Sequence, residues 1–146
     1  MQERSRKEKN ILYIVVPCYN EEQVLAETSK RLKEKCEMLI HDGKIAKESR
    51  IVFVDDGSKD HTWNMIDEFH KMDSIFSGVK LSRNRGHQNA LLAGLTMASE
   101  KADIVISMDA DLQDDINAVD QMIEKYYEGC DIVLWCSKCQ RYRYIF

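Results

Sequence analysis

The stretch of sequence best suited to chemistry is "DADLQDD", residues 109–115, which carries four aspartates directly after an apolar run. Carboxylates gathered at the end of a buried strand repel one another, and their pKa values rise unless a cation or hydrogen-bond donors compensate. Asp109 and Asp111 are separated by one residue, so in an extended loop both can offer oxygen ligands to Mg²⁺ or Mn²⁺ on the same side. The alternative is a polar turn in which Asp114 or Asp115 caps the next helix. Because Mg²⁺ fills its shell with water and substrate phosphates, the metal interpretation also predicts a diphosphate ligand.

A second acidic cluster lies in "VDDGSKDHT", residues 54–62. Asp55 and Asp56 begin a good turn, and Asp60 is well placed to cap the following helix, so structural roles explain most of the cluster. Two adjacent aspartates are more than such a turn needs. One of them, preferably Asp56, is therefore expected to accept a hydrogen bond from a nucleobase N–H or a ribose hydroxyl.

The third cluster, "SRNRGHQNA", supplies positive charge. Arg83 and Arg85 are expected either to neutralise the nearby carboxylates, to hold a diphosphate, or to be a plain surface pair. Gly86 is expected to begin a helix and to let a ligand approach the backbone closely. His87 is interpreted mainly as a neutral residue at the helix start, with a catalytic base as the alternative.

Short β-branched runs alternate with segments of helical periodicity, which predicts an α/β fold. The runs lack polar alternation, as expected of strands buried on both faces of a mostly parallel, doubly wound sheet with helices on both faces. In such a sheet, ligands bind at the carboxyl ends of the strands, and these ends carry the polar clusters. The expected strands span residues 11–16, 50–55, 77–82 and 103–108, with a fifth at 131–134.

Composition sets limits on the partners. The 146 residues suit a single domain, and 21 basic against 25 acidic residues give a net charge of −4, which argues against nucleic acid as a partner. An odd set of five cysteines without an apolar signal region indicates reduced cytosolic thiols. No apolar run is long enough to span a membrane. The basic leader, residues 1–10, is expected to be solvated, with contact to an anionic membrane surface as the alternative.

Taken together and in this order, "VPCYNEE", "VDDGSKDHT", "SRNRGHQNALLAG" and "DADLQDD" closely resemble the family 2 glycosyltransferases of the GT-A fold. The match is closest to the branch similar to dolichyl-phosphate mannose synthase and bactoprenol glucosyltransferase. It covers residues 11–133, which are thereby expected to be the nucleotide-sugar-binding domain, the nucleotide-binding half of the full fold.

The resemblance implies roles for individual residues. Those expected to bind the nucleotide-sugar donor are Pro17, Tyr19, Glu21, Asp55, Asp56, Arg85 and Asp109. Those expected to hold Mg²⁺ or Mn²⁺ are Asp109 and Asp111. Those expected to act at the phosphates during transfer are Asp111, Gln113 and Arg85.

The resemblance also implies an inverting transferase whose acceptor is a polyprenyl phosphate of cell-envelope or lipid-linked sugar synthesis. Such a protein is expected in the cytoplasm at the inner face of the cell membrane, touching it only peripherally, and a homo-oligomer is left open. Relatives continue with an acceptor-side segment and membrane helices, whereas residues 134–146 depart from the pattern, as if produced by a shifted reading frame. The alternative function is an inactive, truncated nucleotide-binding or interaction domain.

Overall fold

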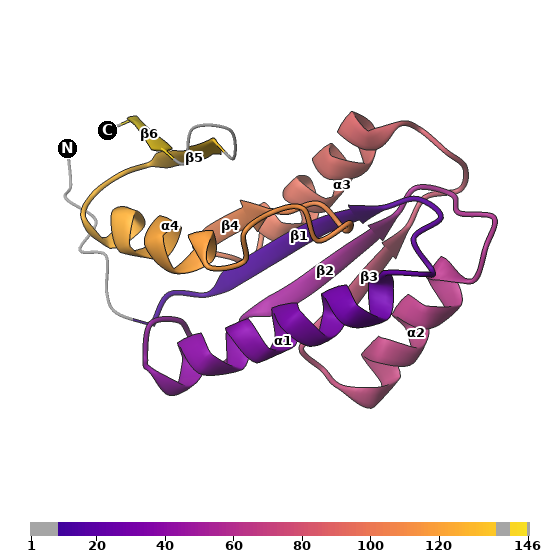
Figure 1. Ribbon diagram of the computed structural model, residues 1–146, viewed down its shortest axis with the longest axis horizontal. Helices are drawn as coiled ribbons and strands as arrows, with labels where there is room; N and C mark the ends of the chain where they lie inside the picture. Colours follow the sequence, from indigo (N-terminus) through magenta and orange to yellow (C-terminus); the bar gives the residue numbers. More distant parts are fainter. Residues whose placement is uncertain (1–8, 137–140, 146) are drawn as a thin grey trace.

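The computed structural model describes residues 9–136 and 141–145, and its centre is a four-stranded parallel sheet (Figure 1). The strand order β3-β2-β1-β4 places β1 inside the sheet, paired with β2 on one side and β4 on the other. These strands agree with the predicted ones within about two residues at each end. Their bounds are β1 Leu12–Cys18, β2 Arg50–Asp55, β3 Phe76–Lys80 and β4 Ile104–Ser107.

Helices cover both faces of the sheet, as predicted (Figure 1). Side chains alternate along β1, so that Ile14 packs into the core beneath α1, α2 and α4, whereas Val15 packs against α3 on the other face. Every residue of β1 is buried, which explains why its sequence lacks polar alternation. The helices span α1 Leu25–His41, α2 Thr62–Met72, α3 His87–Ser99 and α4 Ala118–Tyr127.

The fifth predicted strand forms but does not join the sheet. Strand β5, Ile132–Cys136, pairs antiparallel with β6, Arg141–Ile145, in a separate two-stranded ribbon (Figure 1). Antiparallel neighbours can satisfy each other's backbone groups through a short connection, so β5 finds a local partner in place of the edge of β4. The shifted-frame origin of residues 134–146 stays a prediction.

The side chains of three of the five cysteines can be described, and all three are buried: Cys18, Cys36 and Cys130. Burial raises the pKa of Cys36 to about 12, so this thiol is inert at neutral pH. Cys139 and residues 1–8 of the basic leader lie outside the described residues. Within the described part of the chain, no helix combines the length and apolar character needed to cross a membrane.

Close packing of α3 on the sheet depends on Gly94. A Cβ atom at this position would lie closer than 3.0 Å to methyl carbons of Val15 and Val54. We therefore predict that Gly94→Ala destabilises the fold by about 1–3 kcal/mol, despite the higher helix propensity of alanine. Urea unfolding followed by circular dichroism measures the difference. Thr96→Ala, at an exposed position of the same helix, is the control, and equal stability of both variants would show that α3 is not docked through Gly94.

Candidate active site

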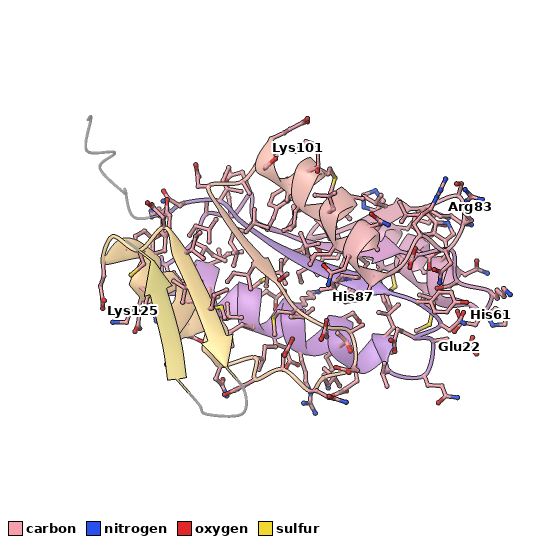
Figure 2. All side chains as sticks on the ribbon, turned by 90° about the horizontal axis from the view of Figure 1, so that it is seen from above. Glu22, His61, Arg83, His87, Lys101 and Lys125 are labelled. Carbon is pink, nitrogen blue, oxygen red and sulfur yellow. The ribbon has the colours of Figure 1, made fainter. Side chains whose placement is uncertain are left out.

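The loops after β1 and β2 form one unit at the carboxyl edge of the sheet. The backbone N–H of Asn20 donates to Ser58 Oγ, and the side-chain oxygen of Asn20 accepts the N–H of Lys59, each over 2.9 Å. The N–H of Glu21 donates to Thr62 Oγ1, also over 2.9 Å. Figure 2 shows Glu22, His61 and Arg83 at the same end of the molecule, opposite Lys125. The predicted convergence of "VPCYNEE", "VDDGSKDHT" and "SRNRGHQNALLAG" on one edge is confirmed.

Asp56 ties the second cluster to the third. Its side chain is almost fully buried, and its two carboxylate oxygens accept the backbone N–H groups of Arg85 over 2.6 Å and of Gly86 over 3.1 Å. Such charge-assisted bonds are stronger than those between neutral groups. Asp56 therefore holds the loop that leads into α3, a role that the sequence did not reveal. Its contact with a nucleoside stays a prediction.

The turn after β2 packs closely against the loop that leads into α3. Asp55 is fully buried: its Oδ1 accepts the N–H of Ser58 over 3.3 Å, and its Oδ2 has no hydrogen-bond partner among the described residues. Gly57 has a φ of 70°, and a Cβ atom there would collide with the backbone of Arg83 and Asn84. The sequence placed the N-cap of the next helix at Asp60, which is wrong by one residue, because His61 is the N-cap of α2; the Asp60 carboxylate accepts the N–H of Thr62, the first residue of α2, over 2.9 Å.

A cavity of about 190 Å³ opens at this edge. Four of the predicted donor-binding residues line it together, namely Pro17, Tyr19, Glu21 and Asp56. The other lining residues are Cys18, Asn84, Gly86, His87 and Ala90. Of these, the sequence analysis had no role for Cys18, Asn84 or Ala90. Two of them could have been predicted from the sequence, because Cys18 lies inside the "VPCYNEE" cluster and Asn84 lies between the two arginines.

The aspartates of "DADLQDD", residues 109–115, have two kinds of role. Asp114 accepts the N–H of Asp109, and Asp115 accepts the N–H of Asn117 next to the start of α4, each over 2.9 Å. These two aspartates therefore stabilise a polar turn, but neither caps α4, whose N-cap is Asn117 without a side-chain cap bond. Ala110 is buried between Asp109 and Asp111, which are both exposed. Ala110 and Asp111 lie in a turn and Leu112 has a φ of 62°, so the loop is not extended as predicted, although both carboxylates are exposed on either side of a buried residue.

The role of Asp109 and Asp111 as ligands of a hard cation stays a prediction. Asp111 Oδ1 accepts the N–H of Gln113 over 3.1 Å, and Asp109 Oδ1 lies 3.7 Å from His87 Nε2. Carboxylate oxygens keep further lone pairs for a cation after accepting one such bond. Among the described residues, no three His, Cys, Asp or Glu side chains are grouped so as to hold a metal ion. A pair of carboxylates is nevertheless what Mg²⁺ takes when a diphosphate completes its shell.

The positive charges of the third cluster remain free at this edge. Arg83 and Arg85 are both exposed, and their guanidinium groups pair with no carboxylate in the part of the chain that the structure describes. Of the three interpretations offered by the sequence, neutralisation of the acidic cluster is not realised. An exposed guanidinium beside the cavity can still hold phosphate oxygens.

A larger cavity of about 370 Å³ lies elsewhere, between β4, α4 and β5. It is lined by Asp114 and Asp115 but by none of the residues expected to bind donor or metal. The smaller cavity is the better candidate for the site, because the polar groups of three strand ends converge there.

Repulsion among the carboxylates is visible at Glu21, which lines the smaller cavity. Partial burial raises the pKa of the Glu21 carboxyl above its ordinary value of 4.5, and the negative charges of Asp111, Asp60 and Asp109 raise it further. The clusters "VPCYNEE", "VDDGSKDHT" and "DADLQDD" are therefore close enough to interact electrostatically. A cation at Asp109 and Asp111 would relieve this repulsion.

We predict that Glu21→Gln raises the melting temperature at pH 7. Because the pKa of Glu21 is raised in the folded state, its stabilising contribution is present below 4.5 and is lost as the pH rises through the folded-state pKa. At neutral pH the ionised carboxylate opposes folding, and glutamine removes that charge. The gain should vanish as the pH falls below 4.5. Thermal melts between acidic and neutral pH measure it.

Glu27→Gln is the matched control on the neighbouring helix. The pKa of Glu27 is lowered by its hydrogen bond to Arg31, so its replacement should give no gain at pH 7. A melting temperature of Glu21→Gln at or below that of the unaltered chain at pH 7 would contradict the electrostatic interpretation.

Comparison with solved structures shows the fold. The mannosyltransferase PcManGT from Pyrobaculum calidifontis, in complex with GDP-Man and Mn²⁺, is similar with a TM-score of 0.59 at 24% identity over 70% of this chain and 28% of that one. Staphylococcus aureus TarS 1-349 in complex with UDP gives a TM-score of 0.58 at 20% identity over 80% of this chain and 33% of that one. Both are GT-A glycosyltransferases, so the predicted GT-A fold is confirmed.

Comparison of sequences shows the family. Uncharacterized glycosyltransferase YkoT of Bacillus subtilis (strain 168) is 51% identical over 128 residues, which are 88% of this chain and 38% of that protein. Bactoprenol glucosyl transferase of Shigella phage SfV is 39% identical over 121 residues, which are 83% of this chain and 37% of that protein. The chain thus spans a little over a third of these relatives. The profile described as Glycosyl transferase family 2 matches residues 13–142, and the chain belongs to that family.

Proposed function

We propose that this chain supplies the donor-binding part of an inverting glycosyltransferase that moves a sugar from a nucleotide diphosphate to a polyprenyl phosphate. One observation carries the proposal: the cavity at the ends of β1 and β2 and the outward carboxylates of Asp109 and Asp111 lie at the same edge of the sheet. A nucleoside in the cavity would direct its diphosphate towards those carboxylates, through which a divalent cation can join the protein to the phosphates.

The residues of the cavity suit a nucleoside. Tyr19 is 40% exposed and offers an aromatic face for a base, and Pro17 adds apolar surface. Glu21 is placed to accept hydrogen bonds from a base or ribose, and so is Asp56 through its remaining lone pairs. Asp55, next to Asp56 in the chain, is buried, and its Oδ2 has no hydrogen-bond partner among the described residues.

The transfer needs little from the protein beyond placement and charge. An oxygen of the acceptor phosphate forms a bond to the anomeric carbon while the bond to the diphosphate oxygen breaks, and the electron pair leaves with the nucleoside diphosphate. Attack opposite the leaving group inverts the anomeric centre. A phosphate acceptor is already anionic, so no general base is required. A cation held by Asp109 and Asp111 would stabilise the charge that develops on the leaving group.

Two exposed residues complete the phosphate end of the site. Arg85 can donate to phosphate oxygens through its free guanidinium group, while its backbone N–H remains bonded to Asp56. The backbone N–H of Gln113 bonds to Asp111, which holds the residue in the turn. Its side chain is exposed, so the side-chain amide is available for the diphosphate. Both residues would orient the leaving group.

The choice of acceptor and location rests on the relatives. Their names include Bactoprenol glucosyl transferase and Undecaprenyl-phosphate 4-deoxy-4-formamido-L-arabinose transferase, both of which refer to a polyprenyl carrier. A carrier of this kind resides in a membrane, which favours action of the full-length protein at the cytoplasmic face of the cell membrane. The remaining length of such relatives leaves room for an acceptor side that this chain does not span.

Metal-dependent donor binding is the first test. Calorimetry with UDP and with GDP, each with and without Mn²⁺, should show binding of at least one nucleotide that strengthens with the metal. Asp111→Asn should weaken that binding at least tenfold, about 1.4 kcal/mol, because a neutral amide removes charge from the cation. Asp115→Asn is the matched control, since Asp115 serves the start of α4. Equal affinity with and without metal would exclude the cation from the site.

Transfer of radiolabelled sugar to undecaprenyl phosphate distinguishes the enzyme from an inactive binding domain. Product formed by the 146-residue chain alone would show that it holds both sides of the reaction. Product formed only after the remaining two thirds of a relative's sequence is joined to it would assign donor binding to this chain and acceptor binding elsewhere. Nucleotide binding without product in either form would favour the inactive domain.

A further inference from the structure

Thr28 carries a buried hydroxyl on the first turn of α1, on the face of the helix that packs against the core. Only 1% of the residue is exposed. Its Oγ1 lies 2.7 Å from the carbonyl oxygen of Ala110, which is 82 residues away in sequence, and 3.1 Å from the carbonyl oxygen of Val24 in its own helix. A hydroxyl has a single hydrogen to donate, so these two acceptors compete for it.

The contact with Ala110 is the stronger candidate. The carbonyl of Val24 already accepts the backbone N–H of Thr28 over 3.0 Å, as helical geometry requires. The carbonyl of Ala110 has no other donor among the described residues, and Ala110 is itself buried. Leaving a buried carbonyl without a donor is costly, and 2.7 Å is an ideal O–H···O distance. The Thr28 hydroxyl therefore donates to Ala110.

This bond reaches the acidic turn, which is formed by residues 109–115. Ala110 is the central residue between Asp109 and Asp111. The Asp109 N–H donates to Asp114 and the Gln113 N–H donates to Asp111, so both of these bonds stay within the turn. Local bonds of this kind shape a turn without fixing it relative to the sheet. The bond from Thr28 does fix it, because α1 is packed against the core along its whole length.

The same face of α1 also holds the far end of this segment. Lys35 lies seven residues after Thr28, two helical turns along the same face. Its ammonium group bonds to Asp120 Oδ2 over 2.6 Å and to Asn117 Oδ1 over 3.3 Å. Segment 110–120 is thus attached to α1 at both ends, once at the acidic turn and once at the start of α4.

We propose that Thr28 is a positioning residue of the metal site: its hydroxyl fixes the backbone of Ala110 and thereby sets the directions of the Asp109 and Asp111 carboxylates. The inference rests on the proposed function, because it assigns the two carboxylates to a divalent cation. Thr28 itself touches neither the cation nor the donor. Small rotations of the turn would alter the spacing of the ligand oxygens, to which Mg²⁺ and Mn²⁺ are sensitive.

Three variants test the proposal. Thr28→Val keeps the shape of the side chain and removes the donor, whereas Thr28→Ser keeps the donor and removes a methyl group. Ser29→Ala is the matched control, because the Ser29 hydroxyl is also buried on α1 but bonds only to Ala26 of the same helix, over 2.8 Å. A general weakening of α1 would affect Ser29→Ala and Thr28→Val alike.

Mn²⁺ affinity in the presence of saturating UDP is the first measurement, by electron paramagnetic resonance of free Mn²⁺. Thr28→Val should bind Mn²⁺ roughly fivefold more weakly or worse, while Thr28→Ser and Ser29→Ala stay within about twofold of the unaltered chain. UDP affinity without metal should not change. Wild-type Mn²⁺ affinity in Thr28→Val, or equal losses in Thr28→Val and Thr28→Ser, would overturn the proposal.

Amide hydrogen exchange is the second measurement and needs no ligand. The N–H groups of Asp109 and Gln113 should exchange faster in Thr28→Val than in Thr28→Ser or Ser29→Ala, because the turn has lost its attachment to α1. Unchanged exchange would refute the positioning role whatever the metal does. If exchange accelerates but the unaltered chain shows no metal-dependent binding, the positioning role stands and the proposed metal-dependent function fails.

Discussion

Parallel pairing of β1 with both β2 and β4 is the constraint on which the site depends. Parallel strands carry their carboxyl ends to the same edge, and the in-register pairs of Cys18 with Asp55 and of Val15 with Ser107 bring the polar clusters there. Burial of all seven β1 residues under helices on both faces holds this register, because a slip of one residue would exchange the two apolar faces. Clusters separated by up to about 90 residues thus meet at one cavity and one acidic turn.

The cost of this arrangement is repulsion between carboxylates, and the chain limits it with backbone N–H donors. Asp56, Asp60, Asp114 and Asp115 each accept at least one such donor, and each thereby fastens a turn or the start of a helix. The Glu21 carboxylate accepts no hydrogen bond from the described residues, and partial burial together with the neighbouring carboxylates raises its pKa. Asp109 and Asp111 add further exposed carboxylates at this edge, where we propose that a cation balances the charge.

The local elements and their order could be predicted from the sequence, because buried runs and helical periodicity depend on neighbouring residues. The placement of β5 could not, since an apolar run of five residues does not indicate which strand it will pair with. The buried bonds of Asp56 were hidden for a related reason: a carboxylate that binds a ligand and one that binds a distant loop look the same in sequence. The role of Thr28 could not be predicted either, because the partner of its hydroxyl, the carbonyl of Ala110, is 82 residues away in sequence.

The central claim, that the strand edge binds a nucleoside diphosphate through a cation at Asp109 and Asp111, is tested most directly by paramagnetic broadening. The ¹⁵N-labelled chain is titrated with Mn²⁺ in the presence of UDP or GDP, and loss of each amide signal is followed by NMR. We expect signals of residues 109–113 and of Gly86 to disappear first, those of α4 beyond Asp120 to persist, and the pattern to be lost in Asp111→Asn. Broadening that is uniform, or centred on the exposed acidic side chains of α1, would contradict the claim.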